Sequence, residues 1–292
     1  MTLDGLYVPL ITPFDAAGEV ALDALADLAH QVIEGGAAGL VALGTTGEPG
    51  ALSAAEQHAV VDVAAHVCRE RGAQLIVGAS TLDALESLRG RPEVTAALSV
   101  VPPFTRPGEA GVLAHFTRLA AASPVPLVVY HVPYRTGQAL SADALRTIGG
   151  LPGVAGVKYA QGGIDEATIE LMADLPAGFA VLGGDDVFVS PLLALGAHGA
   201  ILASAHLATP EFAELIEAWH AGDAPRARAI GHRLASLSKA LFAEPNPTVI
   251  KAVLHARGVI PTADVRLPLL PAGPESAAVA LGHADALRHT DA

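Results

Sequence analysis

Short runs of apolar residues recur along the chain, and a longer segment with helical spacing follows most of them. Most of the runs are continuous rather than alternating, which is typical of strands buried on both faces of a parallel sheet. Eight strands are predicted: Leu6–Leu10, Leu40–Leu43, Leu75–Val77, Ala96–Val101, Leu127–Val132, Val154–Tyr159, Phe179–Leu182 and Ala200–Ala203. The pattern therefore indicates a parallel sheet whose strands are joined by helices.

The segments between the strands carry start and stop signals for helices. Gly35 and Gly36 end the segment LDALADLAHQVIEGG, Ser53 and Glu56 form a capping box at the start of another, and Ser141 opens a third. Eight strands with intervening helices match an α/β fold of the (β/α)8 TIM barrel type. A doubly wound sheet usually has about five or six strands, and its glycine fingerprint is missing here.

Beyond residue 208 the sequence shows helical patterns and no further strand. We predict one domain, with the barrel at residues 1–208 and a C-terminal helical extension at 209–292. The extension should pack on the barrel, because no polar linker precedes it. The final stretch, residues 274–292, is predicted to be a short helix followed by a frayed tail.

Composition and charge exclude several classes of protein. The 292 residues are 51% hydrophobic and 16% charged, so the chain can bury a large core and is not disordered. No apolar run reaches the roughly 18 residues that a membrane-spanning helix needs. The formal net charge of −13 argues against nucleic acid as a partner, because binding it needs a basic face. A lone cysteine, Cys68, and an N-terminus without a signal-peptide pattern lead us to expect a cytoplasmic protein.

Lys158 stands near the end of the sixth predicted strand, in the sequence GVAGVKYA. The active site of a barrel lies at the C-terminal ends of its strands, so a polar side chain there is a candidate for chemistry. Burial lowers the pKa of a lysine and makes a neutral amine available to attack a carbonyl carbon. The alternative is a lysine whose stem is buried while its head reaches solvent or a carboxylate.

The sequence GTTGE, residues 44–48, directly follows the second predicted strand. Gly44 and Gly47 allow the backbone to approach a ligand closely. Thr45 and Thr46 add hydroxyls beside free backbone N–H groups, which suits a small carboxylate or phosphate. An ordinary glycine-rich turn with a capping threonine is equally compatible with this spacing.

The sequence YHVPYRTG, residues 130–137, ends the fifth predicted strand. Tyr130 can act as a general acid or base where a cation or a relay lowers its pKa. Arg135 can bind a carboxylate through two parallel hydrogen bonds. The alternative is a tyrosine of the core and an arginine solvated at the surface.

The sequence GGDD, residues 183–186, follows the seventh predicted strand. Two adjacent aspartates suggest a metal site, but the 12 histidines show no HxH, HxxxH or HExxH spacing. We therefore expect no metal, and we expect Asp185 or Asp186 to cap the following helix instead.

The motifs GTTGE, YHVPYRTG and GVKYA, at the ends of strands two, five and six, together resemble one known family. It is the dihydrodipicolinate synthase / N-acetylneuraminate lyase family of pyruvate-dependent class I lyases and aldolases. The resemblance runs from about Leu6 to Pro271 and includes the sequences GLYVPLITPF, LGAHGAI, EPNPTVIK and VRLPLLP. The threonine pair, Arg135 and EPNP are most similar to the synthase branch.

The resemblance implies a role for each candidate in the pyruvate site. Lys158 would form a Schiff base with the keto carbon of pyruvate, so that no separate cofactor is needed. Tyr130 would be the general acid/base, and Thr45 and Thr46 would hold the pyruvate carboxylate and relay protons. The backbone near Ile201 would complete the pocket.

The resemblance also implies a second substrate and an assembly. Arg135 would receive the carboxylate of an aldehyde, and Gly47 would let the substrate approach the backbone. In the synthase branch the aldehyde is aspartate semialdehyde, and the reaction belongs to lysine biosynthesis. The family relation implies a homotetramer built from two tight dimers.

Two features depart from the synthase pattern. Phe104, in VPPFTRP, stands where the proton relay usually takes a second tyrosine from a neighbouring subunit, and it has no hydroxyl. The segment Val77–Leu98 is several residues shorter than usual, so the helix within it should be clipped. The alternatives are therefore another 2-keto acid aldolase or dehydratase, acting on a sugar acid or a hydroxy-keto acid, and a non-catalytic regulator that binds a keto acid.

Overall fold

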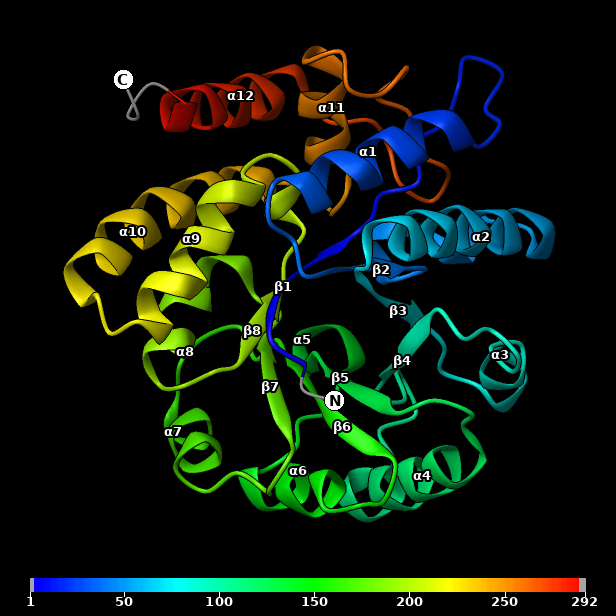
Figure 1. The fold of residues 1–292 in the computed structure, drawn as a ribbon, viewed down its shortest axis with the longest axis vertical. Helices are drawn as coiled ribbons and strands as arrows, with labels where there is room; N and C mark the ends of the chain where they lie inside the picture. Colours follow the sequence, from blue (N-terminus) through cyan, green and yellow to red (C-terminus); the bar gives the residue numbers. More distant parts are fainter. Residues whose placement is uncertain (1–2, 289–292) are drawn as a thin grey trace.

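The computed structural model describes residues 3–288, and its centre is a closed barrel of eight parallel strands (Figure 1). Each strand pairs with the next along the chain, and β8 pairs with β1. The strands are β1 (Gly5–Pro9), β2 (Gly39–Ala42), β3 (Gln74–Gly78), β4 (Val94–Val100), β5 (Leu127–His131), β6 (Val154–Tyr159), β7 (Ala180–Gly183) and β8 (Gly199–Ile201). The eight strands predicted from the sequence are thus confirmed, with ends displaced by at most two residues.

Helices surround the barrel (Figure 1). They are α1 (Leu22–Glu34), α2 (Ala54–Arg71), α3 (Leu82–Glu86), α4 (Gly108–Ala122), α5 (Pro133–Thr136), α6 (Ala142–Gly149), α7 (Glu166–Ala173), α8 (Val189–Ala194), α9 (Thr209–His220), α10 (Ala224–Leu241), α11 (Thr248–Ala256) and α12 (Pro274–Arg288). The capping box predicted for α2 is confirmed, because the side chains of Ser53 and Glu56 each accept a hydrogen bond from the other's backbone N–H. Helix α3 has five residues, as the short segment predicted.

The C-terminal part of the chain extends the barrel with helices. Helix α9 packs against β1 and α8, so it completes the ring of helices around the barrel. Helices α10 and α11 both pack on α12, and Figure 1 shows α11 and α12 outside the ring. The extension proper therefore starts after α9, later than the boundary at residue 209 that the sequence suggested. The last four residues of the predicted tail lie outside the described residues.

Two hydrophobic layers explain why the strands are apolar on both faces. In β1, the Tyr7 side chain lies in the barrel interior, whereas Leu6 and Val8 lie in the layer between strands and helices. The same alternation in β6 puts Val157 in the outer layer and directs Lys158 into the barrel. A continuous apolar strand thus places one charged side chain in the interior.

Cys68 of α2 is a packed thiol. It is buried, unpaired, and close to the backbone oxygen of Gln74. Burial raises the pKa of Cys68 to about 12, so the thiolate needed for nucleophilic chemistry is not formed near neutral pH. Of the helices within residues 3–288, none combines the length and hydropathy of a membrane-spanning segment.

Candidate active site

Lys158 reaches the C-terminal end of the barrel, where Asp185 and Asp186 are near enough to interact with its charge. Its side chain is buried, with 6% of the residue exposed, and Nζ lies 4.4 Å from the centroid of the Tyr130 ring. Tyr130 is its register partner on β5. On the other side stands Gly184, where a Cβ atom would lie 2.8 Å from Cγ of Lys158. Glycine at position 184 therefore leaves the space that the lysine side chain occupies.

The threonine pair forms a short 3-10 turn, Thr45–Gly47, directly after β2. Thr46 is buried, and its Oγ1 accepts a hydrogen bond of 2.9 Å from Nδ2 of Asn246. Because the oxygen already accepts this bond, the hydroxyl hydrogen of Thr46 is free to donate to a ligand. Thr45 Oγ1 accepts a bond of 3.3 Å from Nη1 of Arg135. The turn thus presents two oriented hydroxyls to the same side of the barrel.

Gly47, which the sequence suggested for the approach of substrate to the backbone, does not line the cavity that contains Lys158. Its N–H donates to the backbone oxygen of Gly44, and its own carbonyl accepts a bond of 2.7 Å from Oγ1 of Thr12. A Cβ atom at this position would lie 3.1 Å from the backbone oxygen of Leu10. Glycine at position 47 therefore allows a close approach to the chain after β1.

Arg135 lies at the mouth of the site, on the short helix α5. The side chain is exposed, and its guanidinium carbon lies 5.8 Å from the centroid of the Tyr134 ring. The Tyr134 hydroxyl donates a hydrogen bond of 3.4 Å to Oδ1 of Asp185. Arg135 can therefore meet a ligand that projects outward from the lysine.

The two aspartates of GGDD do not cap a helix, so that prediction is wrong. Asp186 Oδ1 accepts a bond of 2.6 Å from the N–H of Ser204, and Asp185 Oδ2 accepts one of 2.5 Å from the N–H of Gly162. Both N–H donors belong to other βα loops, and the aspartates accept these hydrogen bonds in place of bonds from the start of the following helix. Burial raises the pKa of Asp186 to about 6, against the lowering effects of the Ser204 bond and the Lys158 charge. Within residues 3–288, no group of three or more His, Cys, Asp or Glu side chains could hold a metal ion.

These side chains line one small cavity. Six of the seven residues predicted from the sequence line it, namely Lys158, Tyr130, Thr45, Thr46, Ile201 and Arg135. Sequence reasoning missed Asn246, Asp186 and Tyr134, which line it as well. Its volume is about 10 Å³, close to the space of one water molecule, but an adjoining cavity of about 240 Å³ shares Thr45 and Tyr130 with it. The small cavity holds the polar side chains, and the adjoining cavity offers room for a ligand beside them.

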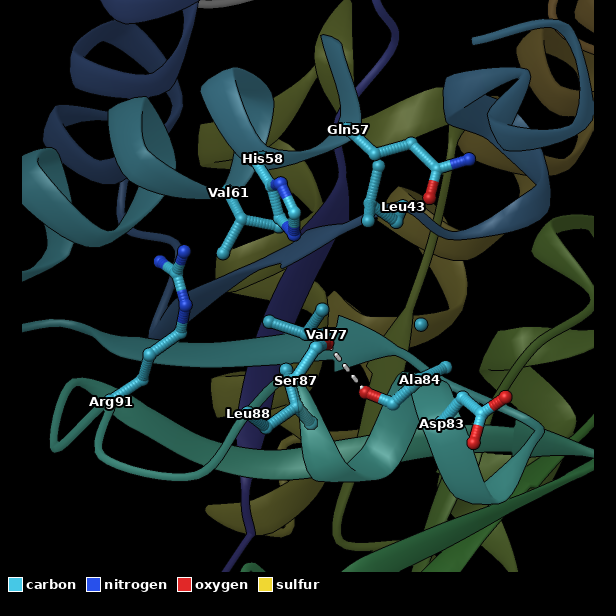
Figure 2. Close-up of a pocket in the computed structure, with 11 residues that line it drawn as sticks. Leu43, Gln57, His58, Val61, Val77, Asp83, Ala84, Ser87, Leu88 and Arg91 are labelled. Carbon is cyan, nitrogen blue, oxygen red and sulfur yellow. Dashed lines mark hydrogen bonds between the residues drawn. The ribbon is translucent and has the colours of Figure 1, made fainter. Parts of the chain in front are cut away.

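Larger cavities occur elsewhere on the protein, including one of about 440 Å³ that is lined by Asp4, Leu193 and Trp219. Another cavity, of about 210 Å³, lies between α2 and α3. Figure 2 shows Gln57 and His58 of α2 on one side of it, and Asp83 and Ser87 on the other. It lies where α3 ends after five residues, and no lysine or tyrosine is among its lining residues. The chemistry therefore assigns the site to the smaller cavity at the end of the barrel.

Phe104 does not line the site of its own chain. It is 87% exposed and its backbone is in the left-handed region, with φ of 66°. A bulky side chain in this region is unusual. Its position agrees with a residue that projects away from its own barrel.

We expect Asp186→Asn to stabilise the fold by about 1–3 kcal/mol at pH 8 and to have little effect near pH 4. The pKa of Asp186 is raised from 3.8 to about 6, so the folded state keeps a proton that the unfolded state has already lost. Wild-type stability therefore falls as the pH rises from about 4 to about 6, and the asparagine variant escapes this penalty. Denaturant unfolding of both proteins at the two pH values measures it. An equal stability difference at both values would contradict the prediction.

Comparisons with known proteins agree with this chemistry. The model of the Dihydrodipicolinate synthetase family matches residues 2–280. A 4-hydroxy-tetrahydrodipicolinate synthase of Synechococcus elongatus is 36% identical over 276 residues, which cover 92% of this chain and 90% of that protein. The synthase of Neisseria meningitidis serogroup B is 37% identical over 273 residues, covering 92% and 93%. The structure of the chloride-inhibited dihydrodipicolinate synthase from Acinetobacter baumannii, complexed with pyruvate, matches with a TM-score of 0.91 and 32% identity, covering 97% of this chain and 99% of that one.

Proposed function

Because this chain belongs to the dihydrodipicolinate synthetase family, we propose that it condenses pyruvate with aspartate semialdehyde, as a 4-hydroxy-tetrahydrodipicolinate synthase does. It is a pyruvate-dependent class I lyase by family. The observation that carries the proposal is the buried Lys158 amine beside the Tyr130 ring, in one cavity with the Thr46 hydroxyl. The product formed by wild-type protein from these two substrates tests it, with other aldehydes assayed in parallel.

Lys158 is the nucleophile of the proposed reaction. Its neutral amine attacks C2 of pyruvate, water leaves, and a protonated imine remains. The imine draws electrons from the neighbouring methyl group, which loses a proton and becomes a nucleophilic enamine. Because the covalent adduct is itself the electron sink, the proposal includes no cofactor. The enamine carbon then bonds to the aldehyde carbon of the acceptor.

The Thr45–Gly47 turn binds the carboxylate of pyruvate in this proposal. The free hydroxyl hydrogen of Thr46 donates to a carboxylate oxygen, because Asn246 already occupies the oxygen of Thr46 as a donor. The backbone at Ile201, on β8, closes the opposite side of the cavity. These contacts orient C2 of the keto acid toward Lys158.

Tyr130 moves the protons. Its ring lies against Lys158 and it lines the cavity together with Thr45. We assign it the transfer of protons to the departing water and to the acceptor oxygen, with Thr45 as the next carrier. Phe104 has no hydroxyl, so in this chain the relay runs through Tyr130, Thr45 and water.

Arg135 meets the carboxylate of the acceptor in this proposal. We expect Arg135→Ala to lower kcat/KM for the aldehyde by about 30- to 1,000-fold, which is the effect of losing a charged hydrogen-bond partner. The pyruvate adduct should form nearly as before, since Arg135 is exposed at the mouth of the cavity whereas Lys158 is buried in it. Steady-state kinetics and borohydride trapping measure the two effects. A matching loss of pyruvate trapping would show that Arg135 maintains the loop instead.

A second candidate function is another aldolase or dehydratase of the same family. Phe104 favours this second function, because an apolar residue in place of the relay tyrosine suits an apolar pocket for another acceptor or a dehydration. The Schiff base on Lys158 would be the same, and the acceptor would be a sugar acid or a hydroxy-keto acid. An acceptor screen separates the two. The shared cavity of Lys158, Tyr130 and Thr46 speaks against a non-catalytic regulator.

We also propose a homotetramer built from two tight dimers. Phe104, Leu267 and Leu270 are exposed large apolar side chains, and a second copy of the chain would cover surfaces of this kind. The family relation supports the same assembly. The unpaired thiol of Cys68 and the biosynthetic role support a cytoplasmic location.

A further inference from the structure

We propose that Glu48 and Lys251 form a positioning pair, which holds the Thr45–Gly47 turn in the conformation that binds the keto acid carboxylate. Through this pair the C-terminal extension sets the affinity for pyruvate. The inference rests on the proposed function, because it takes the turn as the carboxylate site. Glu48 ends the GTTGE motif and Lys251 ends the EPNPTVIK motif, so the inference gives the two motif ends one shared role.

The pair is completely enclosed. Lys251 Nζ lies 2.6 Å from Glu48 Oε1, and the two side chains are 0% and 2% exposed. The same Nζ donates a bond of 2.8 Å to the backbone oxygen of Asp264. Burial lowers the pKa of Lys251, and the Glu48 carboxylate opposes that effect. Two charges removed from water are often no more stable than an apolar pair of similar volume, so what this pair adds is a fixed geometry.

A second contact from the extension holds the other carboxylate oxygen. The backbone N–H of Arg266 donates a bond of 2.8 Å to Glu48 Oε2. The Arg266 guanidinium also donates to the backbone oxygen of Ala51, at 3.0 Å. Both cations lie over the ring of Phe14, with Lys251 at 4.1 Å and Arg266 at 4.4 Å from its centroid. The Glu48 carboxylate is therefore held at both oxygens.

The backbone conformation of Glu48 explains what the hydrogen bonds to its carboxylate achieve. Its φ of 54° is in the left-handed region, which is unfavourable for a side chain other than glycine. This residue joins the turn Thr45–Gly47 to the next turn, Pro49–Ala51, and it follows Thr46 by two positions. Neither Glu48 nor Lys251 lines the cavity with Lys158. The pair therefore acts on the ligand through the direction of the Thr46 hydroxyl.

Glu48→Gln is the primary test. Borohydride trapping at Lys158 over a range of pyruvate concentrations gives the half-saturating concentration, which we expect to rise about 10- to 100-fold. Acetone, which has the keto group without the carboxylate, should be trapped within about twofold of wild type. A general loss of structure would lower both reactions together, whereas a displaced carboxylate site affects pyruvate alone.

The double variant Glu48→Gln/Lys251→Met separates positioning from stability. It removes both charges at similar volume, so thermal stability should return toward that of wild type. The half-saturating pyruvate concentration should stay at least about tenfold above that of wild type. Recovery of pyruvate affinity together with stability would overturn the inference. Asp285→Asn is the matched control, because it breaks the Arg257–Asp285 pair between α11 and α12 and should leave trapping unchanged. A wild-type protein that forms no pyruvate adduct would instead overturn the proposed function itself.

Discussion

Lys158→Met should abolish the adduct that borohydride traps with pyruvate and lower condensation by at least about 10⁴-fold. Methionine keeps most of the side-chain volume in contact with Tyr130 and Gly184, but it has no amine to attack C2 of the keto acid. The chain has three lysines, so mass spectrometry of the reduced protein can assign the adduct to one peptide. Thermal unfolding should show that the fold survives.

Lys239→Met is the control for this experiment. Lys239 is exposed on α10 and does not line the cavity that contains Lys158. Its adduct and rate should equal those of wild type. A pyruvate adduct of wild-type yield in the Lys158→Met protein would refute the assignment of the nucleophile.

Tyr130→Phe should lower the turnover number of condensation by about 10²–10⁴-fold, which is the usual effect of losing a general acid/base. The ring that packs on Lys158 remains, so at equilibrium the pyruvate adduct should still form at the same site. Comparison of turnover with the trapped fraction therefore isolates proton transfer from Schiff-base formation. The turnover number should respond and the half-saturating pyruvate concentration should not.

Tyr159→Phe provides the matched control on the neighbouring strand. The Tyr159 hydroxyl forms a hydrogen bond of 3.1 Å with Thr168 Oγ1 in the outer layer, away from the cavity. Loss of this bond should reduce stability by about 1 kcal/mol and leave turnover within a few-fold of wild type. Equal turnover losses in the two variants would mean that Tyr130 acts by packing and not by proton transfer.

The fold was predictable because a closed parallel barrel makes the same demand on every strand. Side chains that point into the barrel and side chains that point toward the helices must both be apolar, as Tyr7 and Val8 show on the two faces of β1. In the sequence, such strands are continuous apolar runs. Lys158 was recognisable for the same reason, since it is the charged residue within such a run. The three loop motifs then followed from their places at strand ends.

The missed residues depend on contacts that no local pattern encodes. Asn246 reaches Thr46 across 200 residues of chain, and Lys251 reaches Glu48 across 203. Asp186 resembles a helix cap in sequence, but its carboxylate accepts a hydrogen bond from the backbone N–H of Ser204 in the next loop. Lys251 also shows that a helix can bury a lysine completely where a distant carboxylate meets it, which the apolar-strand criterion overlooks.

The same long-range contacts separate two events during synthesis of the chain. Once β8 has left the ribosome, all eight strands and Lys158 are available, and the barrel can close. The turn at Thr46 still lacks Asn246, Lys251 and Arg266 at that stage. A nascent or truncated chain that ends after β8 therefore carries its nucleophile in an unfinished pocket. If the turn binds the keto acid as proposed, we expect tight binding only once the chain up to Arg266 has been made.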